Sequence, residues 1–366
     1  MGAWWESLRR QTMDGMSSVD PVTALSAFVV LSILVVAVLV VGGHGRRLRS
    51  AAPASSLAVP SPMPPPLSVD EAARSAATVA ALRGMPRVSS RSRRLEEQGG
   101  HLTRMVSALV RLGPTGDRAL AALVQGETGP ALTVLATTVQ NQTQGRARSK
   151  DGGAGALCDL AVLALLDDPA AAVAAIRRAT ELAPNSFGIW HLLGLAAVEA
   201  GDWGQARAAS ESVLASGDSD KERLAGALGL LGESHLAEGR LDQAEACLRI
   251  ALIHQAGLEA PGGRARYYQM LSDVYQKRGD GAGAAGVLSR ALALGPDLGD
   301  RESMAELETA AGLLAHQRGG LPDACRHWAR ARELFQAVGR ADRAAEIGQR
   351  MTAALRAPPS NPLESR

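Results

Sequence analysis

The residues able to do chemistry are few in this chain, and they are not spaced as a reaction centre would need. The seven histidines are scattered without an HExxH pair, and the three cysteines, at positions 158, 247 and 325, form no CxxC. Neither a zinc site nor a disulfide framework is therefore expected. His316 and His327 with Cys325 could suggest a ligand cluster, but the repeat pattern described below places them on different helices.

The sequence also lacks the loops that bind phosphates or expose a nucleophile. It contains no GxxxxGK[ST], no GxGxxG opening a βαβ unit and no GxSxG turn after a strand, and its three lysines are Lys150, Lys221 and Lys277. Asp167 and Asp168 stand before a proline, which is a turn signal. No catalytic, metal or cofactor site is expected, and the chain is not predicted to be an enzyme.

The composition excludes nucleic acid as a partner and favours helices. The 366 residues carry 39 Lys and Arg against 37 Asp and Glu, and only 3% are aromatic. Such a chain offers neither a basic surface nor a base-stacking platform. Ala, Gly, Leu and Arg are abundant and no long stretch alternates with period two, so the predicted fold is all-α.

One segment near the N-terminus is predicted to be a transmembrane helix over residues 22–43. The run VTALSAFVVLSILVVAVLVV holds twenty uncharged residues, which span about 30 Å as a helix. It follows a tail at 1–21 and is followed by HGRRLR, which resembles a stop-transfer flank. The apolar run is longer than that of a signal peptide, so we expect an uncleaved, single-pass anchor.

The charges beside this segment predict its orientation. Arg46, Arg47 and Arg49 follow the apolar run, whereas Arg9 and Arg10 precede it. Because lysine and arginine near the membrane favour the cytoplasmic side, the C-terminal body is expected in the cytoplasm, at the inner (cytoplasmic) membrane. The alternative is a short cytoplasmic tail with the body on the periplasmic side.

A Pro- and Ala-rich linker at 44–68 separates the membrane segment from the helical body. Ser68 and Glu71 form a capping-box pattern that begins a helical segment at 69–150. A second helix is predicted over 94–112, with a broad apolar face.

Five arginines without an acidic residue lie between these two helices. They could contact anionic lipid headgroups, or they could belong to a solvated loop between the helices. They are Arg83, Arg87, Arg91, Arg93 and Arg94.

A repeat of 34 to 40 residues begins near residue 153. In 187–218, Trp190 and Gly194 are followed by a Gly201-Asp202 turn and by an alanine at 206. Equivalent positions recur in the neighbouring copies, for example Ala172, Gly232, Ala244, Tyr268, Ala284, Gly312, Ala324 and Trp328.

This spacing over 153–340 resembles the tetratricopeptide repeat, especially its longer bacterial forms. The resemblance implies an α-solenoid of two-helix hairpins preceded by one transmembrane helix, with small residues where the two helices of a hairpin meet. The array is predicted to cover 151–356, ending in a capping helix at 341–355, before a disordered tail at 357–366. The Arg- and Ala-rich composition suggests a bacterial source.

The resemblance further implies that the first helix of each hairpin lines a groove for a partner protein or peptide. The positions carried over are apolar toward the N-terminus and mixed polar toward the C-terminus. Alternatively, these positions are solvated, or the helices of 69–112 fold back and fill the groove. The candidates are His191, Leu195, Glu233, Arg266, Gln269, Asp273, Gln276, Lys277, Thr309 and His316, with Leu157, Ala161, Ala164, Val198, Leu236 and Leu313 on the same face.

The predicted function is that of a membrane-anchored scaffold that binds a partner protein in this groove. Two alternatives stay open. One is a periplasm-facing assembly factor similar to the tetratricopeptide proteins of cytochrome c maturation. The other is a structural protein that associates with itself through its repeats.

Overall fold

The computed structural model describes residues 66–85, 94–96, 100–144, 150–216, 220–256, 263–295 and 301–356. The predicted tail at 1–21, the membrane helix at 22–43, nearly all of the linker at 44–68 and the tail at 357–366 lie outside these residues. No helix in the described part of the chain is both long and apolar enough to cross a membrane. The regular structure of these residues is helical, as predicted.

Four helices precede the repeats. They are α3 (Val69–Gly84), α5 (His101–Val110), α6 (Pro114–Val124) and α7 (Gly129–Gln144). The capping box predicted at the start of α3 is present, since Ser68 N donates to Glu71 Oε2 over 2.8 Å and Glu71 N donates to Ser68 Oγ over 3.3 Å. The α7 helix packs against the first helix of the array.

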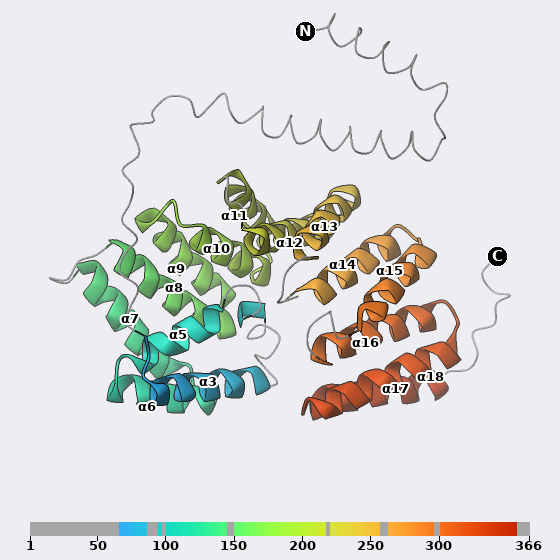
Figure 1. Ribbon diagram of the computed structural model, residues 1–366, viewed down its shortest axis with the longest axis horizontal. Coiled ribbons are helices and arrows are strands. Elements are labelled where there is room, and N and C mark those ends of the chain that lie inside the picture. Colours follow the sequence, from blue (N-terminus) through green and yellow to red (C-terminus); the bar gives the residue numbers. More distant parts are fainter. Residues whose placement is uncertain are drawn as a thin grey trace, which may run out of the picture. The chain divides into compact units, whose positions relative to one another are not determined.

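The array consists of five helical hairpins and a final helix (Figure 1). We call the first helix of each hairpin helix A and the second helix B. The A helices are α8 (Lys150–Asp167), α10 (Phe187–Glu199), α12 (Lys221–Ala237), α14 (Arg264–Lys277) and α16 (Arg301–Gln317). The B helices are α9 (Pro169–Leu182), α11 (Trp203–Ala215), α13 (Leu241–Gln255), α15 (Gly281–Leu294) and α17 (Leu321–Ala337), and α18 (Ala341–Arg356) ends the array.

Small residues let the two helices of a hairpin approach closely, as the repeat pattern predicts. Ala206, Ala244 and Ala284 on the B helices are completely buried. A Cβ added at Gly232 of α12 would lie 2.8 Å from Leu248 Cγ of α13. A larger side chain at this crossing would therefore push the helices apart.

The Gly-Asp turns have a direct structural reason. Gly201 and Gly279 end their A helices with φ values of 74° and 78°, a left-handed conformation that favours glycine. The following aspartates then cap the B helices. Asp202 Oδ1 accepts a hydrogen bond from Gln205 N over 3.0 Å, and Asp280 Oδ1 accepts one from Gly283 N over 2.7 Å.

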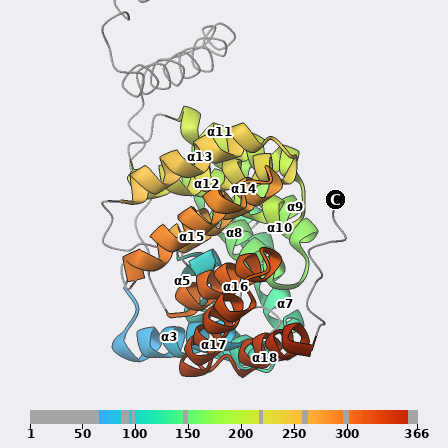
Figure 2. The same ribbon diagram turned by 90° about the vertical axis from the view of Figure 1, so that its right-hand side faces the viewer.

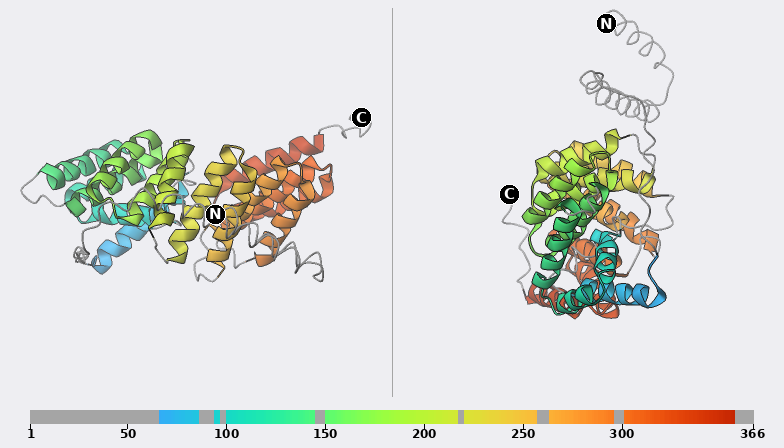
Figure 3. Two further views of the ribbon diagram at one scale, coloured as in Figure 1. Left: turned by 90° about the horizontal axis from the view of Figure 1, so that it is seen from above. Right: turned by 90° about the vertical axis from the view of Figure 1, so that its left-hand side faces the viewer.

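Successive hairpins stack on one another in chain order. Each A helix contacts the next A helix, and each B helix contacts the A helix that follows it. Figure 2 shows α16, α17 and α18 together at one end of this stack, and Figure 3 shows the hairpins following one another from green through yellow to red. The structure is an all-α helical solenoid, as expected.

Candidate protein-binding face

The predicted groove residues all lie on A helices, which lie side by side from α8 to α16. We call the surface that they form the A-helix face. The structure divides it into a covered part, on α8 and α10, and an open part, on α14 and α16, with α12 between them.

The covered part is filled by a helix of the same chain. The α5 helix packs on α8, as Figure 1 shows, and the ring of His101 stacks on that of His191 of α10, with centroids 6.5 Å apart and an interplanar angle of 24°. Leu102 and Met105 of α5 belong to one apolar cluster with Leu195. The rest of the covered part, namely Leu157, Ala161, Ala164 and Val198, is buried in the same cluster.

This corrects the prediction that His191 and Leu195 line a partner site. Leu195 is 1% exposed, and His191 is buried as well. An apolar surface on adjoining A helices is stabilised by burial, and α5 supplies an amphipathic face to cover it. The structure has adopted the alternative in which the segment 69–112 folds back onto the array.

Arg94 extends this cover toward α12. Its Nη1 donates to Glu199 Oε1 of α10 over 2.9 Å, and its Nη2 donates to Glu233 Oε2 of α12 over 2.6 Å. The Arg94 side chain is only 7% exposed. Burial alone would lower the pKa of Arg94, but the charges of Glu233 and Glu199 outweigh it and raise that pKa.

The burial of Arg94 corrects its assignment as a lipid contact, because a guanidinium held between two carboxylates inside the array cannot reach a headgroup. Of the other arginines in that prediction, Arg83 is exposed at the end of α3. Arg87, Arg91 and Arg93 lie outside the described residues.

Glu233 joins the covered part to the open part. Its Oε1 accepts a hydrogen bond over 2.6 Å from Nη2 of Arg266, a residue of α14 whose side chain is 40% exposed. Burial would raise the pKa of Glu233, but Arg94 and Arg266 lower it below its ordinary value. The Glu233 carboxylate is thus held ionised between two guanidinium groups.

The open part of the face is mixed polar. On α14, Gln269 and Gln276 are half-buried and Asp273 is exposed. Lys277 Nζ donates to Leu236 O over 3.1 Å, which places this ammonium beside the end of α12. The protein around Asp273 removes enough water to raise the pKa of its carboxyl to about 6, an effect that Lys277 reduces.

The predicted residues of α16 are divided between core and surface. Leu313 is 38% exposed, and His316 is exposed with its ring 5.5 Å from that of the buried Trp328. Thr309, in contrast, is buried and donates its hydroxyl to Ala305 O of its own helix over 2.8 Å. Thr309 is therefore not available to a partner, which corrects that prediction.

Sequence reasoning missed a series of ion pairs that fasten each repeat to the next. They join residues 31 to 38 positions apart, which is about one repeat period. A search for opposite charges at the repeat spacing would have found them. The pairs are Arg207 with Glu238, Arg278 with Glu245, Arg340 with Glu302 and Arg343 with Glu306.

The described residues do not assemble a reaction centre or a metal site. Within them, no group of three or more His, Cys, Asp or Glu side chains could hold a metal ion. His327 Nδ1 lies 2.7 Å from Glu308 Oε2, and Arg330 Nε lies 3.3 Å from Glu308 Oε1. This cluster has the geometry of a salt bridge between α16 and α17.

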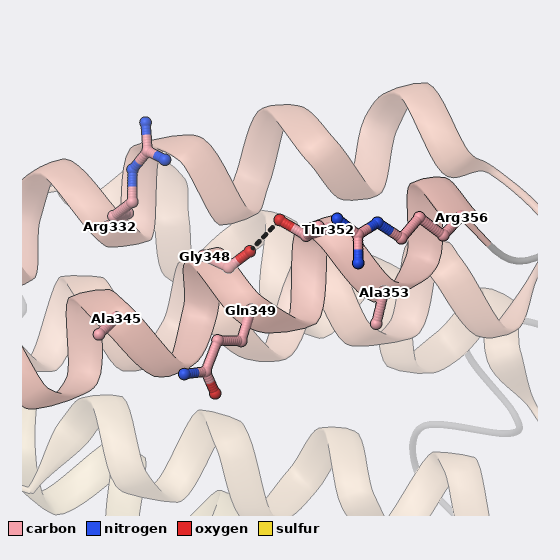
Figure 4. A pocket seen from close by; sticks show the side chains of 7 residues that line it. All are labelled: Arg332, Ala345, Gly348, Gln349, Thr352, Ala353 and Arg356. Carbon is pink, nitrogen blue, oxygen red and sulfur yellow. Dashed lines mark hydrogen bonds between the residues drawn. The ribbon is translucent and has the colours of Figure 1, made fainter.

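A hollow of about 570 Å³ lies at the end of the array, between α17 and α18 (Figure 4). Its lining is mostly small, with Gly348, Ala345 and Ala353 on α18 and Arg332 on α17. Thr352 Oγ1 donates to Gly348 O over 2.9 Å within the helix. These residues lie away from the open face and offer no convergent polar groups.

No protein-family model matches the chain, and no curated protein matches it. Among solved structures, a tetratricopeptide repeat protein from Parabacteroides merdae is 12% identical, with a TM-score of 0.46, and covers 75% of this chain and 99% of its own. A thermophilic repeat protein of Thermus thermophilus is 22% identical, with a TM-score of 0.42, over 54% of this chain and 95% of its own. MamA is 18% identical, with a TM-score of 0.37, over 47% of this chain and 91% of its own.

Proposed function

We propose that the chain is a scaffold that binds a segment of a partner protein on the open part of its A-helix face and has no catalytic activity. The observation that carries this proposal is the contrast between the two parts of that face. On α8 and α10 the face is sealed by α5, whereas on α14 and α16 the exposed side chains of Asp273, Leu313 and His316 remain accessible.

The chemistry of the open part suits a protein segment. Asp273 and Lys277 offer opposite charges, Gln269 and Gln276 offer amide groups, and Leu313 offers apolar surface. A groove of stacked A helices presents such groups at regular intervals to an extended or helical segment.

We further propose that the segment 22–43 anchors this scaffold in the inner membrane, with the array on the cytoplasmic side. The twenty-residue apolar run and the arginines after it support the anchor and its orientation. Confinement to the membrane would raise the local concentration of the array near membrane-bound partners. The periplasm-facing alternative requires the opposite orientation. Reporter fusions after Arg366 distinguish the two, with a fluorescent protein active inside and a phosphatase active outside.

Site-specific photo-crosslinking tests the binding face itself. A photoreactive amino acid replaces Gln276 or His316 in the full-length protein, and cells are irradiated before the products are identified by mass spectrometry. The matched control is Gln243, an exposed residue of the B helix α13. We expect a defined adduct from the two face positions and none from Gln243. Adducts with a second copy of the chain would favour the self-associating alternative, and equal labelling at all three positions would refute the binding face.

A further inference from the structure

Two carboxylates of consecutive A helices converge on a single guanidinium. Glu199 of α10 and Glu233 of α12 have side chains that are 22% and 17% exposed. Each accepts a hydrogen bond from a different terminal nitrogen of Arg94. This division matches the planar fork of an arginine, whereas the compact ammonium of a lysine would not place its donors in this way.

The carboxylates belong to the repeat array, but their occupant does not. Arg94 is part of the described stretch 94–96, which precedes α5. On the other side, Glu233 contacts Arg266 of α14, where the open face begins. The carboxylate pair therefore lies at the boundary between the part of the face that the chain covers itself and the part that it leaves open.

We propose that Glu199 and Glu233 form an arginine-binding site of the A-helix face, that Arg94 occupies this site from within the same chain, and that an arginine of the partner segment competes with it. The proposal rests on the proposed function, because it names the chemistry of the partner and a means of regulating its access.

Charge balance explains why the competitor must be a cation. The two carboxylates, Glu199 and Glu233, are balanced by the guanidinium groups of Arg94 and Arg266. Withdrawal of Arg94 leaves one partly buried carboxylate uncompensated, which is strongly unfavourable. A partner arginine restores both the charge and the two hydrogen bonds, a lysine restores the charge, and a neutral side chain restores neither.

The intramolecular occupant lowers the apparent affinity for such a partner. An external arginine binds only the fraction of molecules in which Arg94 has left the site, so its dissociation constant rises by the inverse of that fraction. A partner that also contacts the open face, beginning at Arg266, gains the additional binding energy needed to displace Arg94.

Chemical rescue tests the arginine-binding site. Full-length Arg94→Ala protein is titrated with ethylguanidinium, with ethylammonium at equal ionic strength as the control cation, and its melting temperature is measured. We expect ethylguanidinium to raise the melting temperature more than ethylammonium does. It should have no such effect on the wild type or on Arg94→Ala combined with Glu199→Gln and Glu233→Gln. An equal effect of the two cations on Arg94→Ala would overturn the site, and Arg94→Gln replaces Arg94→Ala if that variant does not fold.

Competition by Arg94 is tested with a labelled peptide, acetyl-Ala-Ala-Arg-Ala-Ala-amide, and its lysine and citrulline counterparts. We expect the arginine peptide to bind Arg94→Ala at least about tenfold more tightly than it binds the wild type, and more tightly than the other two peptides. Equal affinity for the wild type and Arg94→Ala would overturn occupation by Arg94. Equal affinity of the arginine and citrulline peptides for the variant would overturn recognition of arginine.

These outcomes are distinguishable from failure of the proposed function. Rescue by ethylguanidinium requires only Glu199 and Glu233 and no partner protein. If rescue succeeds while Gln276 and His316 yield no adduct, the arginine site stands and the scaffold proposal falls. If the adducts form without rescue, the scaffold stands and the arginine site falls.

Discussion

The Nη2 of Arg94 lies 2.6 Å from Oε2 of Glu233, although 139 residues separate the two along the chain. This ion pair joins the segment before the repeats to the third A helix of the array. Since Glu199 of the second A helix shares the same guanidinium, one arginine connects three separate parts of the fold. The position of the N-terminal segment is thus coupled to the stacking of the repeats.

Replacement of Glu233 by alanine should be strongly destabilising. It removes one of the two acceptors of Arg94 and leaves that buried guanidinium with half of its charge balance, so we expect a loss of roughly 3–5 kcal/mol in the free energy of unfolding. Urea denaturation of the full-length protein measures this loss. Glu211, an exposed residue of α11, is the matched control, and Glu211→Ala should change the free energy by less than about 0.5 kcal/mol. Equal effects of the two substitutions would contradict the structural role of the Arg94 ion pair.

Burial of His101 should make the stability of the fold sensitive to acid. Burial, with smaller contributions from His191 and Arg104, lowers the pKa of His101 to about 3. The unfolded chain binds this proton near pH 6.5, so stability rises with pH between about 3 and 6.5 and is lost as the pH falls. Between pH 7.5 and 5 we expect this histidine to cost the wild type about 2 kcal/mol, a cost absent from His101→Phe. Urea midpoints of both proteins at the two pH values measure it, and a constant difference between them would contradict the burial of a neutral His101.

Asp159 of α8 should have the opposite pH dependence. Burial raises the pKa of its carboxyl to about 7, an effect that Arg104 and Arg111 reduce. The folded protein therefore holds this proton more tightly than the unfolded chain, and the stability that it contributes is lost as the pH rises from about 4 through 7. Asp159→Asn has no proton to lose, so its stability relative to the wild type should be greater at pH 8 than at pH 5. A relative stability that falls over the same range would have the wrong sign.

The repeat architecture was predictable because its causes are local and periodic. Alanine at 206, 244 and 284 and the Gly-Asp turns at 201 and 279 recur at the repeat spacing, and each has its role within a single hairpin. The ion pairs between repeats, such as Arg207 with Glu238, also have a periodic signal. That signal was overlooked because the motif search compared residue types rather than opposite charges.

The cover on the A-helix face was not predictable in the same way. The apolar positions of α5, such as Leu102 and Met105, indicate an amphipathic helix but not the surface on which it packs. Arg94 was grouped with its neighbouring arginines because its partners, Glu199 and Glu233, lie 105 and 139 residues away without a common period. Such contacts follow from the tertiary arrangement and leave no local pattern.

Glycine in the A helices should be essential only where a neighbouring ring approaches it. A Cβ at Gly229 of α12 would lie 2.4 Å from Cε1 of the buried Tyr267, so Gly229→Ala should destabilise the protein by roughly 1–3 kcal/mol despite its better helix propensity. Gly286 of α15 is the control, because a Cβ there meets nothing within 4 Å. Gly286→Ala should stabilise the protein by roughly 0.5–1 kcal/mol. Thermal denaturation compares the two variants, and destabilisation by both would show that close approach is not the cause.

Thiol labelling should distinguish the covered part of the A-helix face from the open part. Val198 and His316 occupy equivalent positions of the second and fifth repeats, yet Val198 is buried beneath the cover and His316 is exposed. Because reaction of a buried thiol requires local opening, Val198→Cys should react with a maleimide roughly 100-fold more slowly than His316→Cys at pH 7.5. The native Cys158 and Cys247 should also react slowly, since burial raises the pKa of their thiols to about 12 and about 11. Peptide mapping assigns the label to each site, and labelling in urea verifies that every thiol can react. Equal rates for the two introduced cysteines in the folded protein would show that α5 does not cover the face.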